Sequence, residues 1–324
     1  MKASTGQRPS RRAALCSMGV GIALITSVAV GGCASQIDDP APRIVISGAS
    51  GQLGGLVVEE LLARGVQPGD LILVSRSPER LERYAELGAS TRFGDFTQPE
   101  SLDTAYEGGT RLLLISLNSN NVNPSIIRET RAEFHQIAID AAVEAGIEHI
   151  VYTSFVDADN NVSPIAPAHR ATEAALRESG ITWTALRNQW YADGLVTQAA
   201  RMIEGGRVVV LPDDPGVAFV TREDCAVAAA VALMTPGHEN RVYEITGPAM
   251  VRMRDVASIA SEISGIEIEV IEAGPEDEVR APRPSGTTLT NHFRDITGEP
   301  GTTARDLLES NRDVLLEARG GESR

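Results

Sequence analysis

A glycine-rich stretch near residue 45 constrains the fold of this chain more than any other segment. Ile44 to Ser47 is a short apolar run that predicts a buried strand, and Gln52 to Arg64 predicts a helix with one apolar face. Between them lie Gly48, Gly51 and Gly54, in the spacing G-x-x-G-x-x-G. Glycine suits positions where a backbone bends tightly and a diphosphate approaches it, and a helix N-terminus offers free N–H groups to phosphate. The stretch predicts a nucleotide-binding turn, with a purely structural turn as the alternative.

Strand and helix signals alternate regularly after residue 43, and this alternation predicts an α/β fold. We expect a Rossmann-type, doubly wound parallel sheet with helices on both of its faces. The expected strands are Ile44–Ser47, Leu71–Ser75, Thr91–Phe93, Leu112–Ser116, His149–Thr153 and Trp183–Arg187. The expected helices between them are Leu53–Arg64, Pro78–Leu87, Pro99–Ala105, Ser125–Ala145 and Ala168–Ser179. Later in the chain we expect helices at Leu195–Glu204, Arg222–Met234, Val251–Ser264 and Thr303–Leu316, and strands at Val208–Leu211, Val242–Ile245 and Ile266–Ile271.

The N-terminal segment has the pattern of a targeting sequence. Residues 1 to 12 are basic without acids, Met18 to Val30 is apolar, and Val30-Gly31-Gly32-Cys33 follows. This order is typical of a secretory signal that ends in a lipobox, in which Cys33 becomes the lipidated N-terminus. Ser10-Arg11-Arg12 also resembles a twin-arginine export signal. We therefore expect a signal sequence over residues 1–33, a tether over 34–42, and a bacterial lipoprotein anchored on the extracytoplasmic side of the membrane. A retained membrane helix over residues 13–32 is the alternative.

Charge and cysteine content narrow the class of partner. The formal net charge is −15 at pH 7, and loss of the basic N-terminal segment would make the chain more acidic. Such a surface argues against nucleic acid and against a polybasic lipid contact. Of the three cysteines, Cys16 would leave with the signal and Cys33 would carry the lipid, so no internal disulfide is expected. Cys225 lies in an alanine-rich helix, where we expect a small core residue rather than a nucleophile.

Residues at the ends of the expected strands are the candidates for holding a dinucleotide. Arg76 follows the second strand, where an arginine would pair with the 2′-phosphate of NADP and an acid would bind the ribose hydroxyl of NAD. A solvated surface arginine is the alternative. Asp95 follows the third strand and would accept a hydrogen bond from the adenine amino group or form a turn. The expected cofactor contacts are Gly48, Ser50, Gly51, Gln52, Leu53, Gly54, Arg76, Asp95, Ser116, Leu117, Thr153, Ser154, Phe155 and His169.

His169 opens an expected helix and shares one of its faces with Glu173, four residues later. A short-chain dehydrogenase with the usual Tyr-x-x-x-Lys pair would place it about here, at Ile165 and His169, and the pair is absent. The sequence also shows no Ser-His-Asp order, no metal-spaced set of His and Cys, and no P-loop. We therefore expect no metal site.

Several motifs together resemble one family. They are Gly48-x-x-Gly51-x-x-Gly54, Tyr152-Thr-Ser154, His169-x-x-x-Glu173-x-x-Leu176-x-x-Ser179-Gly180, Trp183-Thr-x-Leu186-Arg187-Asn188-x-Trp190-Tyr191, Val220-Thr221-Arg222-Glu223-Asp224 and Ile296-Thr297-Gly298-Glu299-Pro300. The chain resembles the NmrA-like atypical short-chain dehydrogenases, and especially the type 2 NAD(P)H:quinone oxidoreductases, from about residue 43 to 315. The resemblance implies an NAD(P)-binding Rossmann domain over 43–190 and a smaller α+β substrate lobe over 191–318, interleaved with the Rossmann core. Residues 319–324 would be a frayed tail. The shorter, acidic region at 272–290 and the export signal depart from the family.

The resemblance implies hydride transfer from NADP(H), preferred over NAD(H), to a quinone or similar planar acceptor. This chemistry needs stacked rings and exclusion of water more than a Tyr-Lys pair, because the quinolate can take its proton from water or a nearby donor. His169 would be the catalytic residue, either as that donor or by orienting the nicotinamide ribose. Helix capping, with a hydrogen bond to the loop in the 160s, is its alternative role. The expected substrate contacts are Asn118, Asn188, Trp190 and Tyr191.

Two other functions remain open from the sequence. The first is a non-catalytic NAD(P)-binding sensor or regulatory protein, because NmrA-like proteins include dinucleotide sensors that lack the Tyr-Lys pair. The second is an enzyme similar to the nucleotide-sugar epimerases, which the lost tyrosine disfavours. Turnover separates the first alternative from a reductase, since a sensor binds NADPH without consuming it. The expected partners are a small-molecule acceptor and a membrane, reached through the N-terminal lipid or helix.

Overall fold

A computed structural model describes residues 42–117, 124–274 and 288–319 of the chain. The expected signal sequence, lipobox and tether lie outside these residues, as do Asn118, most of the acidic region and the end of the tail. Within the described residues, no helix has both the length and the apolar character that crossing a bilayer requires. Those same residues hold no group of three or more His, Cys, Asp or Glu side chains that could bind a metal ion.

The body of the protein is built on a seven-stranded parallel sheet with the order β3-β2-β1-β4-β5-β6-β8. The strands are β1 Ile44–Ser47, β2 Leu71–Ser75, β3 Ser90–Phe93, β4 Arg111–Leu114, β5 His149–Phe155, β6 Thr182–Asn188 and β8 Arg241–Ile245. The order reverses between β1 and β4, which lie side by side in the sheet. This is the topological switch point at which open α/β sheets bind their ligands. The predicted Rossmann-type sheet is therefore confirmed.

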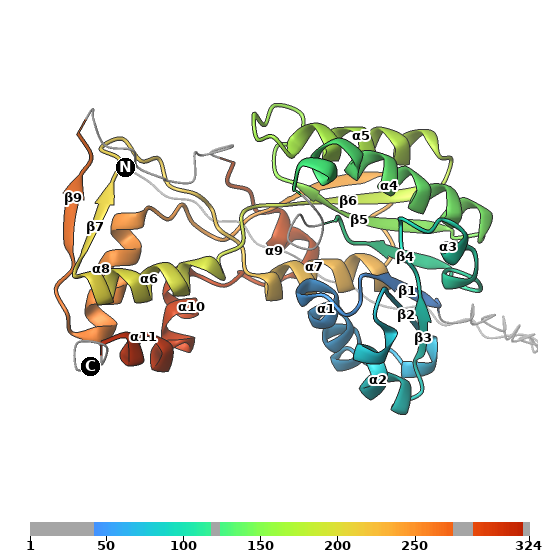
Figure 1. The fold of residues 1–324 in the computed structure, drawn as a ribbon, viewed down its shortest axis with the longest axis horizontal. Helices are drawn as coiled ribbons and strands as arrows, with labels where there is room; N and C mark the ends of the chain where they lie inside the picture. Colours follow the sequence, from blue (N-terminus) through green and yellow to red (C-terminus); the bar gives the residue numbers. More distant parts are fainter. Residues whose placement is uncertain (1–41, 118–123, 275–287, 320–324) are drawn as a thin grey trace, which may run out of the picture. The chain divides into compact units, whose positions relative to one another are not determined.

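Helices cover both faces of this sheet, which is why β1, β2 and β5 are buried along their whole lengths. One face packs against α1 Gln52–Ala63, α2 Glu82–Glu86 and α7 Arg222–Met234, and the other against α3 Glu100–Ala105, α4 Pro124–Glu144 and α5 Ala166–Glu178 (Figure 1). Two short 3-10 turns, Pro68–Asp70 and Pro78–Leu81, lead into β2 and α2. The helix expected at Pro78–Leu87 is thus divided into a 3-10 turn and α2.

Helix α7 lies late in the chain but packs against α1 and the main sheet. The predicted cap is present, because the Thr221 hydroxyl accepts a hydrogen bond of 3.0 Å from the backbone N–H of Asp224. Small alanines let the helix bury nine of its 13 residues. Cys225 is 1% exposed, as expected for a core residue, and burial raises the pKa of its thiol. α9 His292–Thr297, which we did not predict, packs beside α7.

A second group of elements surrounds a hydrophobic cluster of its own. It contains α6 Gly194–Gly205, β7 Arg207–Val210, α8 Met253–Ser264, β9 Glu269–Glu272, α10 Ala304–Ser310 and α11 Arg312–Arg319 (Figure 1). β7 and β9 pair in parallel as a separate two-stranded sheet. The main sheet and this group both draw on residues after 190, because β8 joins β6 in the main sheet.

Two predictions in this region were wrong at their boundaries. The strand expected at Ile266–Ile271 begins only at Glu269, because Ile268 turns into the hydrophobic cluster and its N–H bonds the hydroxyl of Ser261. The single helix expected at Thr303–Leu316 is two helices. Asn311 leaves helical geometry between them, with φ of −106° and ψ of 25°, and its side-chain amide caps the carbonyl of Leu307.

Candidate functional site

The turn between β1 and α1 has the shape that its three glycines predict. Gly48 has φ of +88°, and the N–H groups of Gly48 and Ala49 both bond the carbonyl of Val74 on the neighbouring strand. A Cβ on Gly54 would lie 2.2 Å from the oxygen of Gly48, so only glycine allows the helix to lie this close to the turn. Gly51 caps α1 without any side-chain hydrogen bond. The first turn of α1 therefore offers its N–H groups to an anion.

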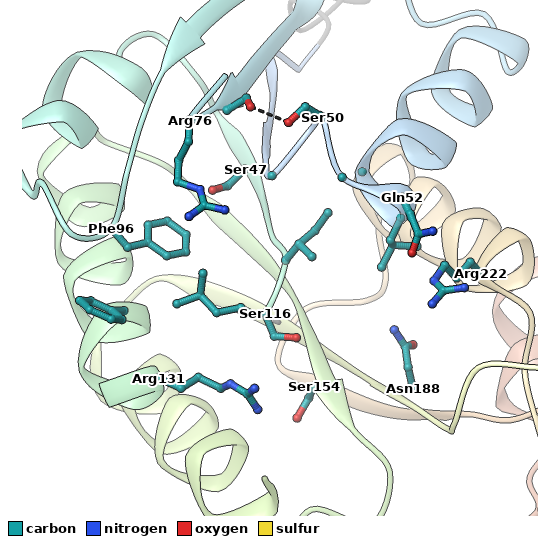
Figure 2. Close-up of a pocket in the computed structure, with 18 of the residues that line it drawn as sticks. Ser47, Ser50, Gln52, Arg76, Phe96, Ser116, Arg131, Ser154, Asn188 and Arg222 are labelled. Atoms are coloured by element: carbon teal, nitrogen blue, oxygen red, sulfur yellow. Dashed lines mark hydrogen bonds between the residues drawn. The ribbon is translucent and has the colours of Figure 1, made fainter. Parts of the chain in front are cut away.

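This turn borders a cavity of about 800 Å³, which lies at the carboxyl ends of the central strands (Figure 2). The volume is that of a typical ligand pocket. Most residues predicted for the site line it: Gly48, Ser50, Gly51, Gln52, Leu53, Gly54, Arg76, Asp95, Ser116, Leu117, Ser154, Phe155, His169, Asn188, Trp190 and Tyr191. These residues come from seven separate stretches of the chain, which the parallel sheet brings to one edge.

One end of the cavity is formed by the loops after β2 and β3, which we call the adenosine end. Arg76 directly follows β2 and is exposed, and Arg80 lies one helical turn further on. Neither arginine forms an ion pair with any residue that the structure describes. The hydroxyls of Ser50 and Ser75 lie 2.6 Å apart and tie the glycine-rich turn to the end of β2. Two exposed cations beside this fixed turn suit a phosphate on a ribose.

Asp95 forms the turn that was one of its two expected roles. Its Oδ1 accepts hydrogen bonds of 2.9 Å from both the N–H and the hydroxyl of Thr97, so the residue does form a turn. The carboxylate also lines the cavity, next to the ring of Phe96. The turn holds both side chains at the adenosine end.

The opposite end of the cavity, which we call the acceptor end, contains a buried chain of hydrogen bonds. Leu117 donates its backbone N–H to Nε2 of His135, so Nδ1 of that ring carries the proton and donates to the hydroxyl of Thr172. Thr172 itself donates to a backbone carbonyl of its own helix. The Tyr152 hydroxyl, 2.8 Å from Nδ1 of His169, then donates to that nitrogen. The network thereby assigns the proton of His169 to Nε2.

His169 is 4% exposed and lines the cavity. Burial, helped by the nearby charge of Arg131, lowers the pKa of His169 to about 3. The ring is therefore neutral near pH 7, and its Nε2–H has no hydrogen-bond partner among the described residues. His169 can donate a hydrogen bond into the cavity, but it is not an imidazolium that could give up a proton.

Glu173, which shares a helix face with His169, belongs to a buried ionic network. Its carboxylate accepts two hydrogen bonds of 2.8 Å from Arg187 and one of 2.7 Å from the Ser154 hydroxyl. Arg187 also bonds Glu244 and Asp159, at 3.0 and 2.9 Å. The network joins β5, α5, β6 and β8, and it fixes the Ser154 hydroxyl at the cavity wall.

Among the predicted residues that the structure describes, one does not line the cavity. Thr153 lies behind its wall, where its hydroxyl accepts a 2.8 Å hydrogen bond from the backbone N–H of Ser116. The N–H of Ser116 thus bonds a side chain and not a backbone carbonyl of β5, and β4 ends at Leu114 instead of Ser116. Asn118 lies outside the described residues.

Three buried polar atoms have no hydrogen-bond partner among the described residues: Nε of Arg131, Oδ1 of Asn188 and Nε2 of Gln189. All three belong to residues that line this cavity. Buried polar groups in proteins are nearly always bonded, so a cluster of unbonded ones indicates a site that is completed by a ligand.

Other lining residues were not predicted, namely Arg80, Phe96, Arg131, Phe134, Gln189 and Arg222. Gln189 and Arg222 lie in motifs that were singled out from the sequence but were given no role there. The sequence also contained a pattern that could have identified Arg131 as a buried residue. Arg131, His135 and Ile139 are spaced four apart on α4 and all are buried, so two polar side chains occupy the inner face of a helix.

Comparisons with known proteins agree with this geometry. A family model described as NAD(P)H-binding matches residues 48–236. Quinone oxidoreductase 2 of Escherichia coli is 35% identical over 225 residues, which cover 69% of this chain and 76% of that protein. The NmrA-like family domain-containing oxidoreductase flvB of Aspergillus flavus is 31% identical over 74% of this chain and 77% of its own. The chain belongs to the NmrA-like family of NAD(P)H-binding proteins.

Solved structures lead to the same family. Triphenylmethane reductase of Citrobacter sp., in complex with NADP(H), has a TM-score of 0.74 and 30% identity over 83% of this chain and 99% of its own. The NADPH complex of quinone oxidoreductase 2 of Escherichia coli also has a TM-score of 0.74, with 29% identity over the same shares. The predicted family is confirmed, and this chain is an NAD(P)H-dependent oxidoreductase.

Proposed function

We propose that this protein transfers a hydride from NADPH to a quinone or a similar planar acceptor. The observation that carries the proposal is a cavity that borders the glycine-rich turn and is lined by three residues with buried polar atoms that have no hydrogen-bond partner among the described residues. Relatives support the same assignment, since two of them are named as a quinone oxidoreductase and a triphenylmethane reductase. These names suggest two classes of planar acceptor.

The residues present fit a phosphorylated dinucleotide. Gly54 leaves no room for a side chain and Gly51 leaves the turn open to a diphosphate, to which the uncapped N-terminus of α1 provides N–H groups. Arg76 and Arg80 would hold a 2′-phosphate, because no acid that could bind a free 2′-hydroxyl directly follows β2. We therefore propose NADP(H) as the preferred cofactor. The relatives of known structure, which were solved with NADP(H) or NADPH, support this preference.

At the acceptor end, the side chains position reactants and exclude water. When bound there, the dinucleotide supplies a hydride. We propose that Nε2–H of His169 donates a hydrogen bond to an oxygen of the nicotinamide ribose or of the acceptor. Because His169 is neutral, water supplies the proton that completes the reduced product. Trp190 lies edge-on to Phe155, with ring centroids 5.1 Å apart, and the pair forms an apolar wall for a planar ring.

Binding and turnover test the proposal in one experiment. The chain has two tryptophans, and Trp190 lines the cavity, so bound nucleotide should quench the fluorescence of the full chain. NADPH and NADH are titrated first, and 1,4-naphthoquinone is then added. Tight NADPH binding followed by quinone-dependent oxidation supports a reductase. Binding without oxidation would indicate a sensor, and no binding would refute the assignment of the cavity.

We also propose that the protein is exported and anchored through a lipid on Cys33. The basic start, the apolar run and the Val30-Gly31-Gly32-Cys33 motif support this proposal. Cys33→Ala should move the protein from the membrane fraction to the soluble fraction, or leave an uncleaved precursor. An unchanged distribution and mass would contradict lipidation. Lysines in place of Arg11 and Arg12 should separately block export if the twin-arginine route is used.

A further inference from the structure

The acceptor end of the cavity contains an arginine that the proposed chemistry does not yet use. Arg131 is 5% exposed, and its Nε is buried without a hydrogen-bond partner. None of the ion pairs among the described residues includes it. Its side chain lines the cavity, and Figure 2 shows the guanidinium directed toward Ser154. A buried cation without a counter-ion is costly, so it indicates a binding role more than a structural one.

The groups around Arg131 do not balance its charge. Burial, the neighbouring His169 and the charge of Arg131 hold the pKa of His135 well below its usual value. Burial raises the pKa of Tyr152, which therefore stays protonated. Glu173 lies nearby, but its carboxylate is occupied by Arg187 and Ser154. Among the described residues, no acid compensates the positive charge of Arg131.

The charge of the cavity lining is opposite to the net charge of the chain. Among the described residues, four arginines line the cavity, at 76, 80, 131 and 222, and one carboxylate, that of Asp95, although the chain has a net charge of −15. Arg222 is paired with Asp193. Arg76 and Arg80 lie at the adenosine end, where the proposed 2′-phosphate would use them. Arg131 alone of the four is buried, unpaired and at the other end.

We infer that Arg131 forms an oxyanion subsite for the acceptor, which selects neutral or anionic carbonyl compounds such as quinones and rejects cationic dyes. This inference rests on the proposed reductase function. The guanidinium is placed to pair with the carbonyl oxygen of the acceptor on the side of the cavity where Ser154 lies. Nε2–H of His169 is a second donor that reaches the same cavity.

The two classes of acceptor differ in how their charge changes. A quinone gains a hydride and becomes a monoanion, whose oxygen then takes a proton from water to give the hydroquinone. A guanidinium beside that oxygen stabilises the negative charge as it develops. A triphenylmethane dye is a cation that gains a hydride at its central carbon and becomes neutral without a proton. The same guanidinium opposes binding of this cation and gains nothing when the charge disappears.

The test compares three acceptors at saturating NADPH: 1,4-naphthoquinone, its 2-sulfonate and the cationic dye malachite green. The variants are Arg131→Met, which keeps the volume but removes the charge, and Arg131→Lys, which keeps the charge. Arg201→Met is the control, because Arg201 is exposed on α6 and lies outside the cavity. Removing one oxyanion donor typically lowers turnover by about 100-fold or more. We expect Arg131→Met to lower kcat/KM for both quinones by at least about tenfold and to raise it for malachite green, whereas Arg131→Lys and Arg201→Met keep the quinone preference.

A second measurement separates failure of the subsite from failure of the reductase. Dissociation constants of the two naphthoquinones are measured by tryptophan quenching in the NADP⁺ complex, where no hydride is available. If the chain reduces no acceptor, the reductase is refuted, but tighter binding of the sulfonate that Arg131→Met abolishes still supports the subsite. Equal binding of both compounds, or an unchanged quinone-to-dye ratio in Arg131→Met, would overturn it. So would a large loss of NADPH affinity in Arg131→Met with the acceptor preference intact, because Arg131 would then hold the cofactor.

Stability provides a further check on the same variant. An unpaired buried charge is destabilising, so the apo form of Arg131→Met should melt at the same temperature as the parent or higher. A clearly lower melting temperature would show that Arg131 supports the fold, and would count against the subsite.

Discussion

The two ends of the cavity are built in different ways. The adenosine end uses backbone geometry and exposed side chains from β1, β2 and the loop after β3, all within residues 44–97. The acceptor end uses buried side chains from α4, β5, α5 and β6, held by hydrogen bonds between residues far apart in sequence. In the function proposed above, the first end would bind the part of the cofactor that all NADP(H) enzymes share. The second would determine the acceptor, and its preorganised polar groups are where we expect chemistry to be tuned.

The largest effect is expected from a variant that disrupts the buried ionic network of Glu173 and Arg187 at the acceptor end. Glu173→Gln keeps the shape of the side chain but removes the charge that pairs with Arg187, which is 6% exposed in its side chain. Disrupting a buried ion pair typically costs about 3–5 kcal/mol. We expect a value near 3 kcal/mol, because Glu244 and Asp159 still contact Arg187. Chemical denaturation measures the loss, with Glu178→Gln on the exposed end of the same helix as control. A change equal to the control would contradict a structural role for the network.

The next variant should prevent nucleotide binding at the adenosine end while the chain stays folded. Gly51 has φ of −80° and ψ of 169°, which valine tolerates, but its Cβ would enter the space beside the Gly48 oxygen at 3.2 Å. Gly51→Val should therefore lower NADPH affinity by about 100-fold or more, since a small misplacement has effects of this size. Calorimetric titration measures the affinity, and circular dichroism verifies the fold. Gly205→Val is the matched control, because a Cβ there meets nothing within 4 Å. Normal binding by Gly51→Val would refute the diphosphate site.

A smaller effect sharpens the nucleotide preference at the same end. Arg76→Asp should weaken NADPH about tenfold or more relative to NADH, because one charge-assisted bond is lost and a repulsion is added. The ratio of the two dissociation constants measures this directly. Arg80→Gln should shift the ratio in the same direction but less, since no new repulsion is introduced. Equal weakening of both nucleotides by Arg76→Asp would remove this residue from the 2′-phosphate site.

A subtler change tests the hydrogen-bond chain at the acceptor end. Tyr152→Phe removes the donor to Nδ1 of His169, so the ring is free to move its proton to Nδ1. We expect kcat to fall by up to about tenfold, which corresponds to one hydrogen bond, with little change in KM for NADPH. Nitrogen NMR gives a readout independent of activity. It should show the Nε2–H tautomer of His169 in the parent and a mixture in the variant. A parent ring protonated at Nδ1 would contradict the assigned network.

Features with a local sequence pattern could be predicted well, and features that depend on tertiary packing could not. The glycine-rich turn, β1, β2 and α7 were predicted to within a residue or two, because their apolar runs and caps are local signals. The break at Asn311 and the late start of β9 depend on packing against α8, which no local pattern reports. Arg76 could be placed because it directly follows a strand. The burial of Arg131 had a local signal, but its role did not, since that role depends on α4 packing beside β5 and α5 and on the lack of a paired acid among the described residues.

The smallest expected effect concerns the pH dependence of kcat, to which we expect His169 to contribute nothing. This result separates two roles of His169 at the acceptor end, that of a hydrogen-bond donor and that of a proton donor. If His169 gave its own proton to the product, kcat would fall as pH rises through its pKa. Because burial lowers that pKa to about 3, the ring is neutral throughout the range from pH 5.5 to 8, and His169 should add no inflection to kcat there.

The stability of the fold, unlike kcat, should depend on the lowered pKa of His169. The unfolded chain binds a proton at His169 below about pH 6.5 and the folded chain does not until about pH 3, so stability should fall as pH decreases through this window. His169→Gln keeps a side-chain N–H donor and removes one titration, so it should reduce the slope on the acid side of the stability curve, to which His135 and His149 also contribute, while retaining part of the activity. A parent kcat profile with an inflection near pH 6.5 that His169→Gln abolishes would instead make His169 the proton donor.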